Sequence, residues 1–498
     1  MNNKGQITVF ISLIMCAVVM LGLFALKICR FYNAKAKSAQ VVNTAISDVK
    51  SGFNSYIYEH YHILLFDKTD YGKGEAAVEK FLGDNIKDNL DNDQSLIYIA
   101  ITDFDLLMDN DCEALKQQIN DYTVYAAISY GANEILSKTG GKEAVVEETV
   151  FNNMDTETNN GSLEDKPDEE SSNKRKEKSS EEKKDDSAIE DENKNEKTNR
   201  KLSLSGSDDD PRDFAKTLGK KGILFFVAPD DLEVSTDNIN LYECPSKGRS
   251  GLWNPYNLND KFDSYSRLKK DLKQNPSWNN ALADAGCGLA YAKDVFNSAV
   301  NQEVNEDSVF KFEIEYLICG RTSDETNLKH TVNKIIAIRF PINYSYLLTD
   351  TPKMSKVKSI AFSLSLVTAI PEPVLKYLIA GCWSYIEAVS DVRILLNGKK
   401  QPFEKNRENW KTDIDNLTES FVKEDENEGE GMGYEDYLLI LMAINMDDAY
   451  IRMLDLIQLN TRQFYPEFRM ENAAVGLTVD ASIECEDSIF NYSISGGY

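Results

Sequence analysis

The chain opens with an apolar segment that is long enough to cross a lipid bilayer. Lys4 is the only charged residue among the first 26, and the stretch from Ile7 to Leu26 has none. Twenty helical residues at ~1.5 Å each span the ~30 Å hydrocarbon layer of a membrane. The sequence therefore predicts a short leader at residues 1–6, a transmembrane helix at residues 7–29, and a single-pass protein held at a lipid bilayer.

The first residues resemble a prepilin-type export signal, in which a short basic leader and a glycine precede an apolar helix. Here the leader contains Lys4 and ends at Gly5, so cleavage is expected between Gly5 and Gln6. Phe10 stands where pilins usually carry a glutamate. The resemblance implies that everything after the helix is exported.

The charges that flank the helix favour the opposite orientation. Lys4 precedes the apolar run, whereas Lys27, Arg30, Lys35 and Lys37 follow it. The positive-inside rule alone would keep the rest of the chain in the cytoplasm. We expect the export signal to dominate and the C-terminal body to be extracytoplasmic.

A helix is expected to continue beyond the membrane, over residues 30–63. Its apolar residues recur every three or four positions and form one seam, consisting of Ala39, Val42, Ile46, Val49, Phe53 and Tyr56. The seam packs either against other helices, in self-association or in a pilus-like stalk, or against the protein's own body. Gly52 interrupts the pattern, and the second interpretation is favoured.

The remainder predicts a mixed α+β body with an antiparallel sheet. Strands are expected where apolar residues alternate or form short runs, at 95–102, 222–227, 309–319 and 475–485. Helices are expected at 75–82, 112–136, 279–296, 324–348, 434–446 and 448–458, and two more within 359–396. The uncharged run at 359–371 is too short to cross a membrane.

A strongly charged segment separates the body into residues 64–138 and 213–498. Between Glu164 and Lys201 there are 14 acidic and 11 basic residues, and Ile189 is the only large apolar one. Such a composition cannot bury enough apolar surface to offset the entropy lost on folding. Residues 139–212 are therefore predicted to be a disordered linker, looped out from one core; two separate cores are the alternative.

No catalytic or metal-binding signature is present in the sequence. His60 and His62 lie two residues apart beside Glu59, and His330 lies within a predicted helix; ordinary packing explains these better than metal binding. The six cysteines beyond the anchor include no C-x-x-C pair. The net charge of −27 argues against nucleic acid as a partner. We expect no cofactor, no metal and no enzymatic activity.

Several blocks of sequence resemble a family of uncharacterised bacterial envelope proteins. They are GQITVFISLIM at the start, FEIEYLICG from Phe312, NLKHTVNKIIAIRF from Asn327, GYEDYLLILMAI from Gly433, RMLDLIQLNTRQ from Arg452 and FRMENAAVGLTVDASI from Phe468. The resemblance is to N-terminally anchored proteins of Gram-positive anaerobes that accompany tight-adherence (Tad, type IV-like) pilus components. It implies an anchored body linked to pilus assembly, and it supplies no catalytic residues.

These inferences predict a non-enzymatic, membrane-anchored accessory or structural component of a tight-adherence pilus or secretion machine. Its expected partners are the lipid bilayer and pilin-like or pilus-platform proteins. Two alternatives remain open at this stage: an envelope enzyme with a site built from scattered acids and tyrosines, and a scaffold that faces the cytoplasm.

Overall fold

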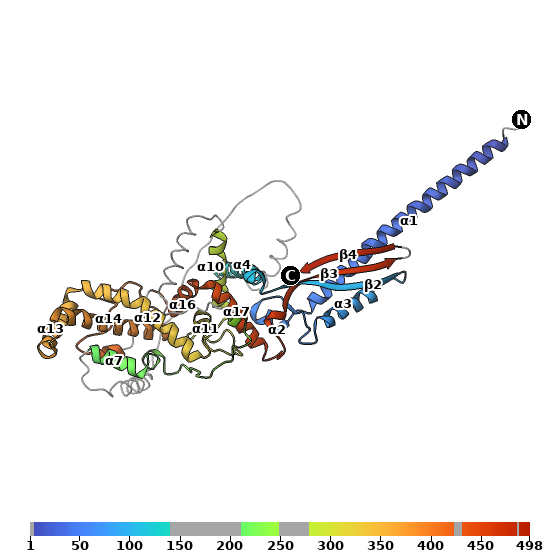
Figure 1. Cartoon of the computed structure of the whole chain (residues 1–498). Helices are drawn as coiled ribbons and strands as arrows, with labels where there is room; N and C mark the ends of the chain where they lie inside the picture. Colours follow the sequence, from blue (N-terminus) through green and yellow to red (C-terminus); the bar gives the residue numbers. More distant parts are fainter. Residues whose placement is uncertain (1–3, 140–210, 249–277, 423–430, 486–487) are drawn as a thin grey trace, which may run out of the picture. The chain divides into compact units, whose positions relative to one another are not determined.

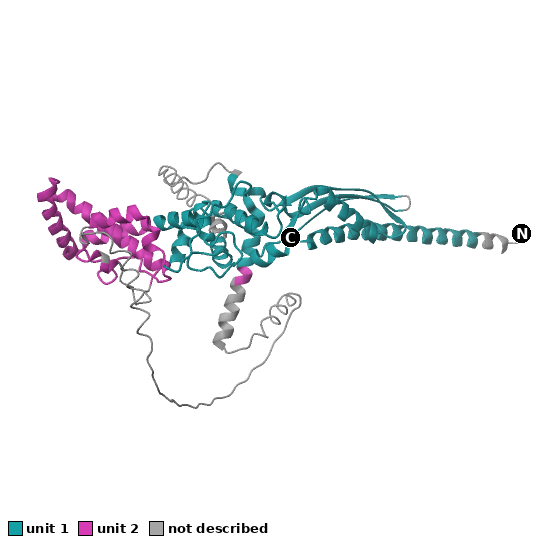
Figure 2. Ribbon diagram, turned by 90° about the horizontal axis from the view of Figure 1, so that it is seen from below, with its two compact units in different colours: residues 1–123, 230–334, 434–498 teal, residues 124–229, 335–433 magenta. Residues whose placement is uncertain are grey.

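The computed structural model describes residues 4–139, 211–248, 278–422, 431–485 and 488–498. These residues belong to two compact units (Figure 2). Unit 1 comprises 1–123, 230–334 and 434–498, and unit 2 comprises 124–229 and 335–433. Residues 140–210 of the predicted linker, and the acidic run 424–430, lie outside the described residues.

Unit 1 contains the sheet and most of the helices (Figure 1). Its elements are α1 (Lys4–Ser51), α2 (Ser55–Tyr61), β1 (Phe66–Asp67), α3 (Glu75–Asn89), β2 (Gln94–Leu106), η2 (Pro245–Gly248), α10 (Trp278–Val295), α11 (Glu313–Cys319), α16 (Tyr434–Ala443), α17 (Met446–Thr461), η3 (Met470–Asn472), β3 (Ala473–Cys485) and β4 (Ser488–Gly497).

Unit 2 is helical among the described residues. It contains α7 (Pro211–Lys221), α8 (Leu224–Val227), α13 (Thr351–Thr368), α14 (Glu372–Leu396) and α15 (Leu417–Val422). The boundary between the units falls within α4 (Asp109–Thr139) and α12 (Asp324–Thr349). The predicted α+β class is thus confirmed, with a long apolar N-terminal helix and a small antiparallel sheet.

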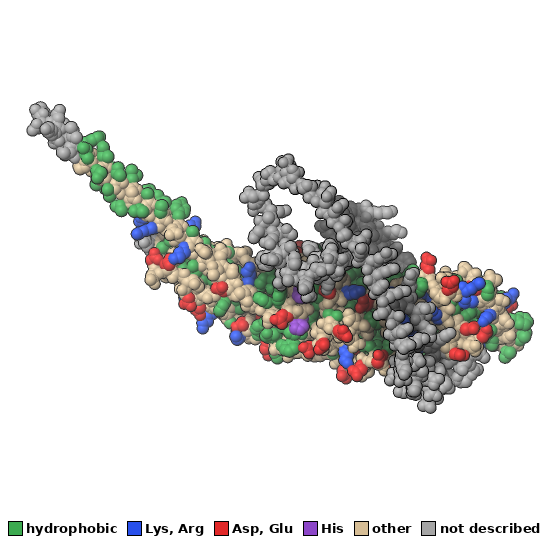
Figure 3. All heavy atoms as spheres, turned by 180° about the vertical axis from the view of Figure 1, so that it is seen from behind, with side chains coloured by type: hydrophobic (Ala, Val, Ile, Leu, Met, Phe, Trp, Pro, Cys, Tyr) green, Lys and Arg blue, Asp and Glu red, His purple; other side chains and the backbone are tan. Residues whose placement is uncertain are grey.

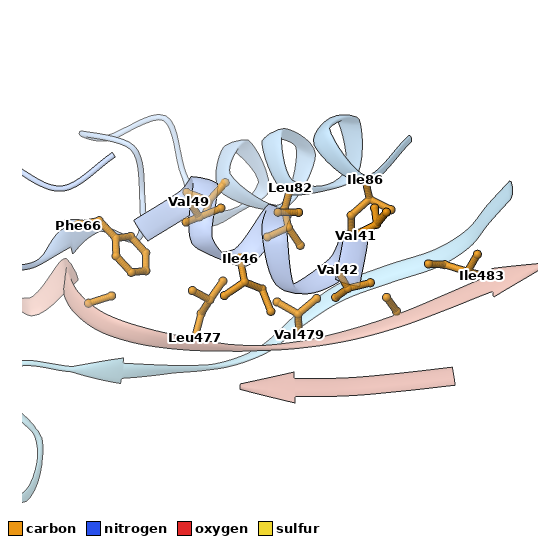
Figure 4. Packing of buried hydrophobic residues seen from close by; sticks show 14 residues of the cluster. Val41, Val42, Ile46, Val49, Phe66, Leu82, Ile86, Leu477, Val479 and Ile483 are labelled. Carbon is orange, nitrogen blue, oxygen red and sulfur yellow. The ribbon is translucent and has the colours of Figure 1, made fainter. Parts of the chain in front are cut away.

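Strand β3 is the centre of the sheet, because each of the other three strands pairs with it in antiparallel fashion. Ala481 of β3, for example, lies opposite Ile99 of β2 and Tyr492 of β4. The C-terminal half of α1 and helix α3 pack on the sheet (Figure 4). Their apolar side chains meet those of β3 in one core, which includes Val41, Val42, Ile46, Val49, Leu82, Ile86, Leu477, Val479 and Ile483.

Helix α1 approaches the sheet closely at a glycine of β4. A Cβ atom built on Gly496 would lie 2.7 Å from the Cγ2 atom of Ile46, closer than real carbon contacts allow. The absence of a side chain at this position lets the buried Ile46 fill the space over the strand.

Unit 2 is held together by a buried cluster of two cations and two anions. Arg339 of α12 donates from Nε and Nη2 to one carboxylate oxygen of Asp391, at 3.0 and 2.9 Å. Lys405 Nζ donates to the other oxygen of Asp391 at 2.7 Å and to Glu387 at 2.6 Å. All four side chains are fully buried.

The cluster also fixes an irregular segment against α14. Glu387 accepts the backbone N–H groups of Lys411 and Thr412, and Arg339 donates to two backbone carbonyls at 402 and 403. Burial alone would raise the pKa of Asp391, but the neighbouring Lys405 and Arg339 hold it below its ordinary value. The four charges therefore balance one another, as buried charges must.

The structure corrects two predicted strands. Residues 309–319 do not form a strand: an irregular lead-in ends at Phe312, and helix α11 follows. The alternation of Phe310 and Phe312 belongs to the lead-in, whereas Glu313–Ile318 is buried on all sides, so the polar face expected of a strand does not exist. Within the predicted strand 222–227, residues 224–227 form the short helix α8, which packs on α14.

Other elements differ in extent or were missed. Helix α3 continues to Asn89, β2 to Leu106, and α7 begins at Pro211, inside the predicted linker. The helix predicted over 30–63 ends at Ser51, and α2 starts anew after Asn54, whose side chain caps it. Strand β4 was not predicted, although its inward residues Phe490, Tyr492 and Ile494 alternate with exposed polar ones.

The close approach at Gly496 yields a first prediction. Gly496→Ala should lower the free energy of unfolding by about 1–3 kcal/mol, because the new methyl group must displace Ile46. Gly497→Ala, next along the strand, should change it by less than about 0.5 kcal/mol, since its Cβ would make only ordinary contacts. Denaturant titration of the detergent-solubilised protein, followed by circular dichroism, measures both. Equal losses would contradict the proposed close packing.

The buried charge cluster yields a second prediction. Lys405→Met should lower the free energy of unfolding by about 3–5 kcal/mol, because it leaves Asp391 and Glu387 buried without their shared cation. The matched variant Lys356→Met removes a half-exposed lysine that pairs with Asp413 and Asp415. It should lower the free energy of unfolding by less than about 1 kcal/mol. The same titration compares the two, and a Lys405→Met protein as stable as Lys356→Met would refute the assignment.

Candidate functional site

The N-terminal half of α1 has an apolar surface that the rest of the described chain leaves uncovered. Every large apolar side chain from Phe10 to Leu26 is 47% to 68% exposed. Figure 3 shows these side chains around the protruding part of the helix. The transfer of each such side chain out of water is favourable by roughly 1.5–3 kcal/mol, so this surface requires a lipid or protein environment. Among the described residues, only this helix is long and apolar enough to cross a membrane.

The helix meets the sheet immediately after its apolar half, at a set of contacts that we call the junction. The rings of Phe31 and Phe490 pack edge to face, with centroids 5.1 Å apart. Tyr492 donates its hydroxyl to the Lys35 carbonyl at 2.8 Å, and Lys37 forms an ion pair with Asp91 at 2.5 Å. The junction thus joins α1 to β4 and to the segment before β2, at the level where lysines follow the apolar run.

A second set of contacts fastens the end of α1 to the end of β4. Lys50 donates to the Gly497 carbonyl at 2.8 Å, and its ammonium lies 5.7 Å from the centre of the Tyr498 ring. The Tyr498 hydroxyl donates in turn to the Lys50 carbonyl. Burial raises the pKa of Tyr498, so this hydroxyl remains a donor over the physiological range.

The structure places the predicted seam on the protein's own body. Val42, Ile46 and Val49 lie in the core between α1 and β3. Ala39 is half-buried on the same helix, while Phe53 lies beyond the end of α1 and Tyr56 in α2. The predicted processing residues Gly5 and Gln6 lie in the first turn of α1, outside the residues whose side chains are described.

His60 and His62 are packed against aromatic rings. His60 stacks on Tyr56 and its Nδ1 atom lies 2.9 Å from the Tyr56 carbonyl. His62 stacks on Tyr122 with ring centroids 4.4 Å apart, and burial lowers its pKa. Within the described residues, no group of three His, Cys, Asp or Glu side chains is placed to hold a metal ion.

The six cysteines beyond the anchor are all at least half-buried. Cys112, Cys244 and Cys485 are buried, and Cys287, Cys319 and Cys382 are half-buried. Burial raises the pKa of Cys244 to about 12, which leaves its thiol protonated and unreactive.

Two carboxylates of α11 form a polar cluster that the sequence analysis did not identify. Glu313 accepts from the Asn297 N–H at 2.9 Å, the Ser308 hydroxyl at 2.5 Å and the Asn460 side chain at 3.0 Å. Glu315 uses one oxygen, Oε1, for the Ala299 N–H at 3.0 Å and the Tyr434 hydroxyl at 2.9 Å. Both carboxylates are completely buried, and they tie the irregular segment 297–308 to helices α16 and α17.

Burial controls the protonation of these two groups. It raises the pKa of both Glu313 and Glu315 to about 7, against the hydrogen bonds that favour the charged form. Asp455 of α17 is in a similar position: it accepts from Tyr316 at 2.6 Å and from the Ser246 N–H at 2.9 Å, and burial raises its pKa. The acids and tyrosines here bond to one another and to loop backbone, an arrangement that stabilises the fold.

The sequence contains a signal for two of the buried acids but not for the other two. Glu387 and Asp391 lie four residues apart in a predominantly apolar part of α14, so they share one face of the helix. Glu313 and Glu315 offered no such signal, because their alternation with apolar residues is also typical of a half-exposed strand.

The Glu315 environment yields a third prediction, on pH. Its folded-state pKa of about 7 lies above the ordinary 4.5, so the stability it contributes is present below pH 4.5 and is lost as pH rises through 7. Glu315→Gln keeps an acceptor at Oε1 and does not titrate. As pH rises from 5 to 8, the free energy of unfolding of the variant should therefore increase by about 1–3 kcal/mol relative to that of the natural protein.

Denaturant titrations at pH 5 and pH 8 measure this difference. Glu59→Gln, at an exposed carboxylate of α2, serves as the control for the removal of a surface charge. If Glu315→Gln loses stability in parallel with the natural protein as pH rises, Glu315 does not titrate as described.

Comparison with known proteins identifies the family but no individual relative. No curated protein and no solved structure matches the chain. The model of a family of unknown function, DUF5702, matches residues 202–485, which is more than half of the chain. The match runs from just before α7 to the end of β3, so it leaves out helices α1 to α4 and strands β1, β2 and β4. The chain therefore belongs to this family of unknown function, DUF5702.

Proposed function

We propose that the protein is a non-enzymatic, membrane-anchored structural or accessory component of a tight-adherence, type IV-like pilus or secretion machine, with its body outside the cytoplasm. The observation that carries the proposal is the division of α1 into two halves. One half has an exposed apolar surface, and the other is buried against an antiparallel sheet.

This division suits a subunit that assembles through its first helix. The apolar half is available to lie in the bilayer and to pack against other apolar helices, since the described body leaves it uncovered. The prepilin-like start supports the same role. The buried half carries the seam that would otherwise form a separate coiled coil, so association is expected to involve residues before the junction.

The junction supports a mechanical role for the body. Because α1 runs without a break from Lys4 to Ser51 and is fastened to β4 at both ends of its packed half, a displacement of the anchor is passed to the sheet. Contacts at the membrane are thereby coupled to unit 1 without a flexible linker between them.

A fourth prediction tests association through the anchor. A photo-reactive amino acid at Leu13 or Leu21, both highly exposed in the apolar half, should form covalent adducts with other apolar protein helices in native membranes. The same amino acid at Thr44, on the exposed side of the packed half, should form none. Mass spectrometry identifies the adducts, and co-purification with pilin-like or platform proteins is the expected result. Adducts with lipid alone at both positions would contradict the proposal.

Orientation is tested in the same cells. Protease added to intact protoplasts should cleave the charged segment 164–201 if the body is extracytoplasmic. Protection of that segment would instead place the body in the cytoplasm, as the lysines and arginine after the apolar run favour.

A further inference from the structure

A second apolar surface lies at the end of the α13–α14 hairpin in unit 2. The two helices pack through buried faces, which include Met354, Val357 and Ala361 on α13 and Leu375 and Ile379 on α14. They are joined at 369–371, where Ala369 adopts a left-handed conformation with φ of 57°. We call the end of this hairpin, residues 358–378, the hairpin tip.

The outer faces of the hairpin tip are apolar and exposed. Leu366 is 73% exposed and Val367 is 83% exposed. The full set of exposed large apolar side chains is Phe362, Leu366, Val367, Ile370, Val374, Tyr377 and Leu378. Figure 3 shows hydrophobic side chains gathered at this end of α13 and α14. Single exposed apolar residues are ordinary, but a set confined to one hairpin end marks an interaction surface.

Three hydroxyl groups of the hairpin tip donate to carbonyls of their own helix. The hydroxyls of Ser363, Ser365 and Thr368 donate to the carbonyls of Ser359, Phe362 and Leu364, at 3.1, 2.7 and 2.8 Å. No charged residue occurs from Ser359 to Pro371. These hydroxyl protons therefore need neither water nor a polar partner, which is the condition for entering an apolar medium.

Basic residues border the apolar surface. Residues 351–378 contain four lysines and a single acid, Glu372, in a chain whose net charge is −27. Lys353 and Lys356 form ion pairs with Asp350, Asp413 and Asp415. Lys358 is exposed and Lys376 half-buried beside the Tyr377 ring, and neither forms an ion pair with a described residue. Their charge complements an anionic surface.

We propose that the hairpin tip inserts into the interfacial layer of a lipid bilayer that contains anionic lipids. The apolar side chains would enter the boundary between headgroups and acyl chains, while Lys358 and Lys376 contact the phosphates. This combination of apolar and aromatic side chains with flanking lysines is typical of segments that lie in the interface. An uncharged run of 13 residues is too short to cross, so the tip lies in one leaflet. The proposal does not depend on the pilus hypothesis.

A fifth prediction tests this inference with the full-length protein in proteoliposomes. A lipid with a photo-reactive acyl chain is placed either in the same vesicles as the protein or in separate, protein-free anionic vesicles mixed with them. Peptide mass spectrometry after illumination should find lipid adducts on residues 359–378 in at least one arrangement. Adducts on the apolar half of α1 in the first arrangement are the internal control.

Matched variants locate the contact. Leu366→Asp should reduce adducts on the hairpin tip at least about fivefold, because an aspartate is costly to place in the interface. Ile444→Asp, at a residue of nearly equal exposure (71%) outside the tip, should leave them unchanged. Lys358→Gln together with Lys376→Gln should weaken the preference for anionic over neutral lipid.

Two outcomes would overturn the proposal: no adducts on the tip in either arrangement, or equal adducts with Leu366→Asp. The substituted side chains Leu366, Lys358 and Lys376 are exposed or half-buried. Circular dichroism should therefore show that the variants fold like the natural protein. Failure of the anchor to associate with pilus helices would leave these results unaffected.

Discussion

The packing of α1 against β3 and β4 is the contact on which unit 1 depends. The same helix has one half without a covering surface and one half whose Val42, Ile46 and Val49 complete the core of a four-stranded sheet. Gly496 permits this contact, since a Cβ atom there would lie 2.7 Å from Ile46 and force it to shift. A single helix thus contains the candidate membrane span and completes the core of the sheet.

Away from the sheet, buried carboxylates hold segments of the chain in place by accepting their backbone N–H groups. Glu313, Glu315 and Asp455 accept N–H groups from loop segments in unit 1, and Glu387 does the same in unit 2. Such segments lack a helical or sheet partner for their N–H groups, and a buried carboxylate supplies one. In unit 2 the charge is neutralised by Lys405 and Arg339, whereas in unit 1 burial moves the pKa of two of the acids to about 7.

Sequence patterns located the elements that carry a strong local signal. These signals are the apolar run of α1, the alternation of β3, the capping residues before α12 and the apolar stretch that contains α13 and α14. The prediction for segment 309–319 was wrong. Its alternation of Phe and Ile with Glu is typical of a strand buried on one side, but it also occurs in this helix, which is buried on every side. Residue pairs such as Arg339 and Asp391, 52 positions apart, have no sequence signal that links them.

The contact of Lys50 with Gly497 joins residues that are 447 positions apart. Strands β3 and β4 leave the ribosome long after α1 has been made, yet they provide the surface that α1 covers. The apolar seam of α1 therefore has no native partner during most of synthesis. Nascent chains that stop before β3 would leave this seam exposed to chaperones and proteases.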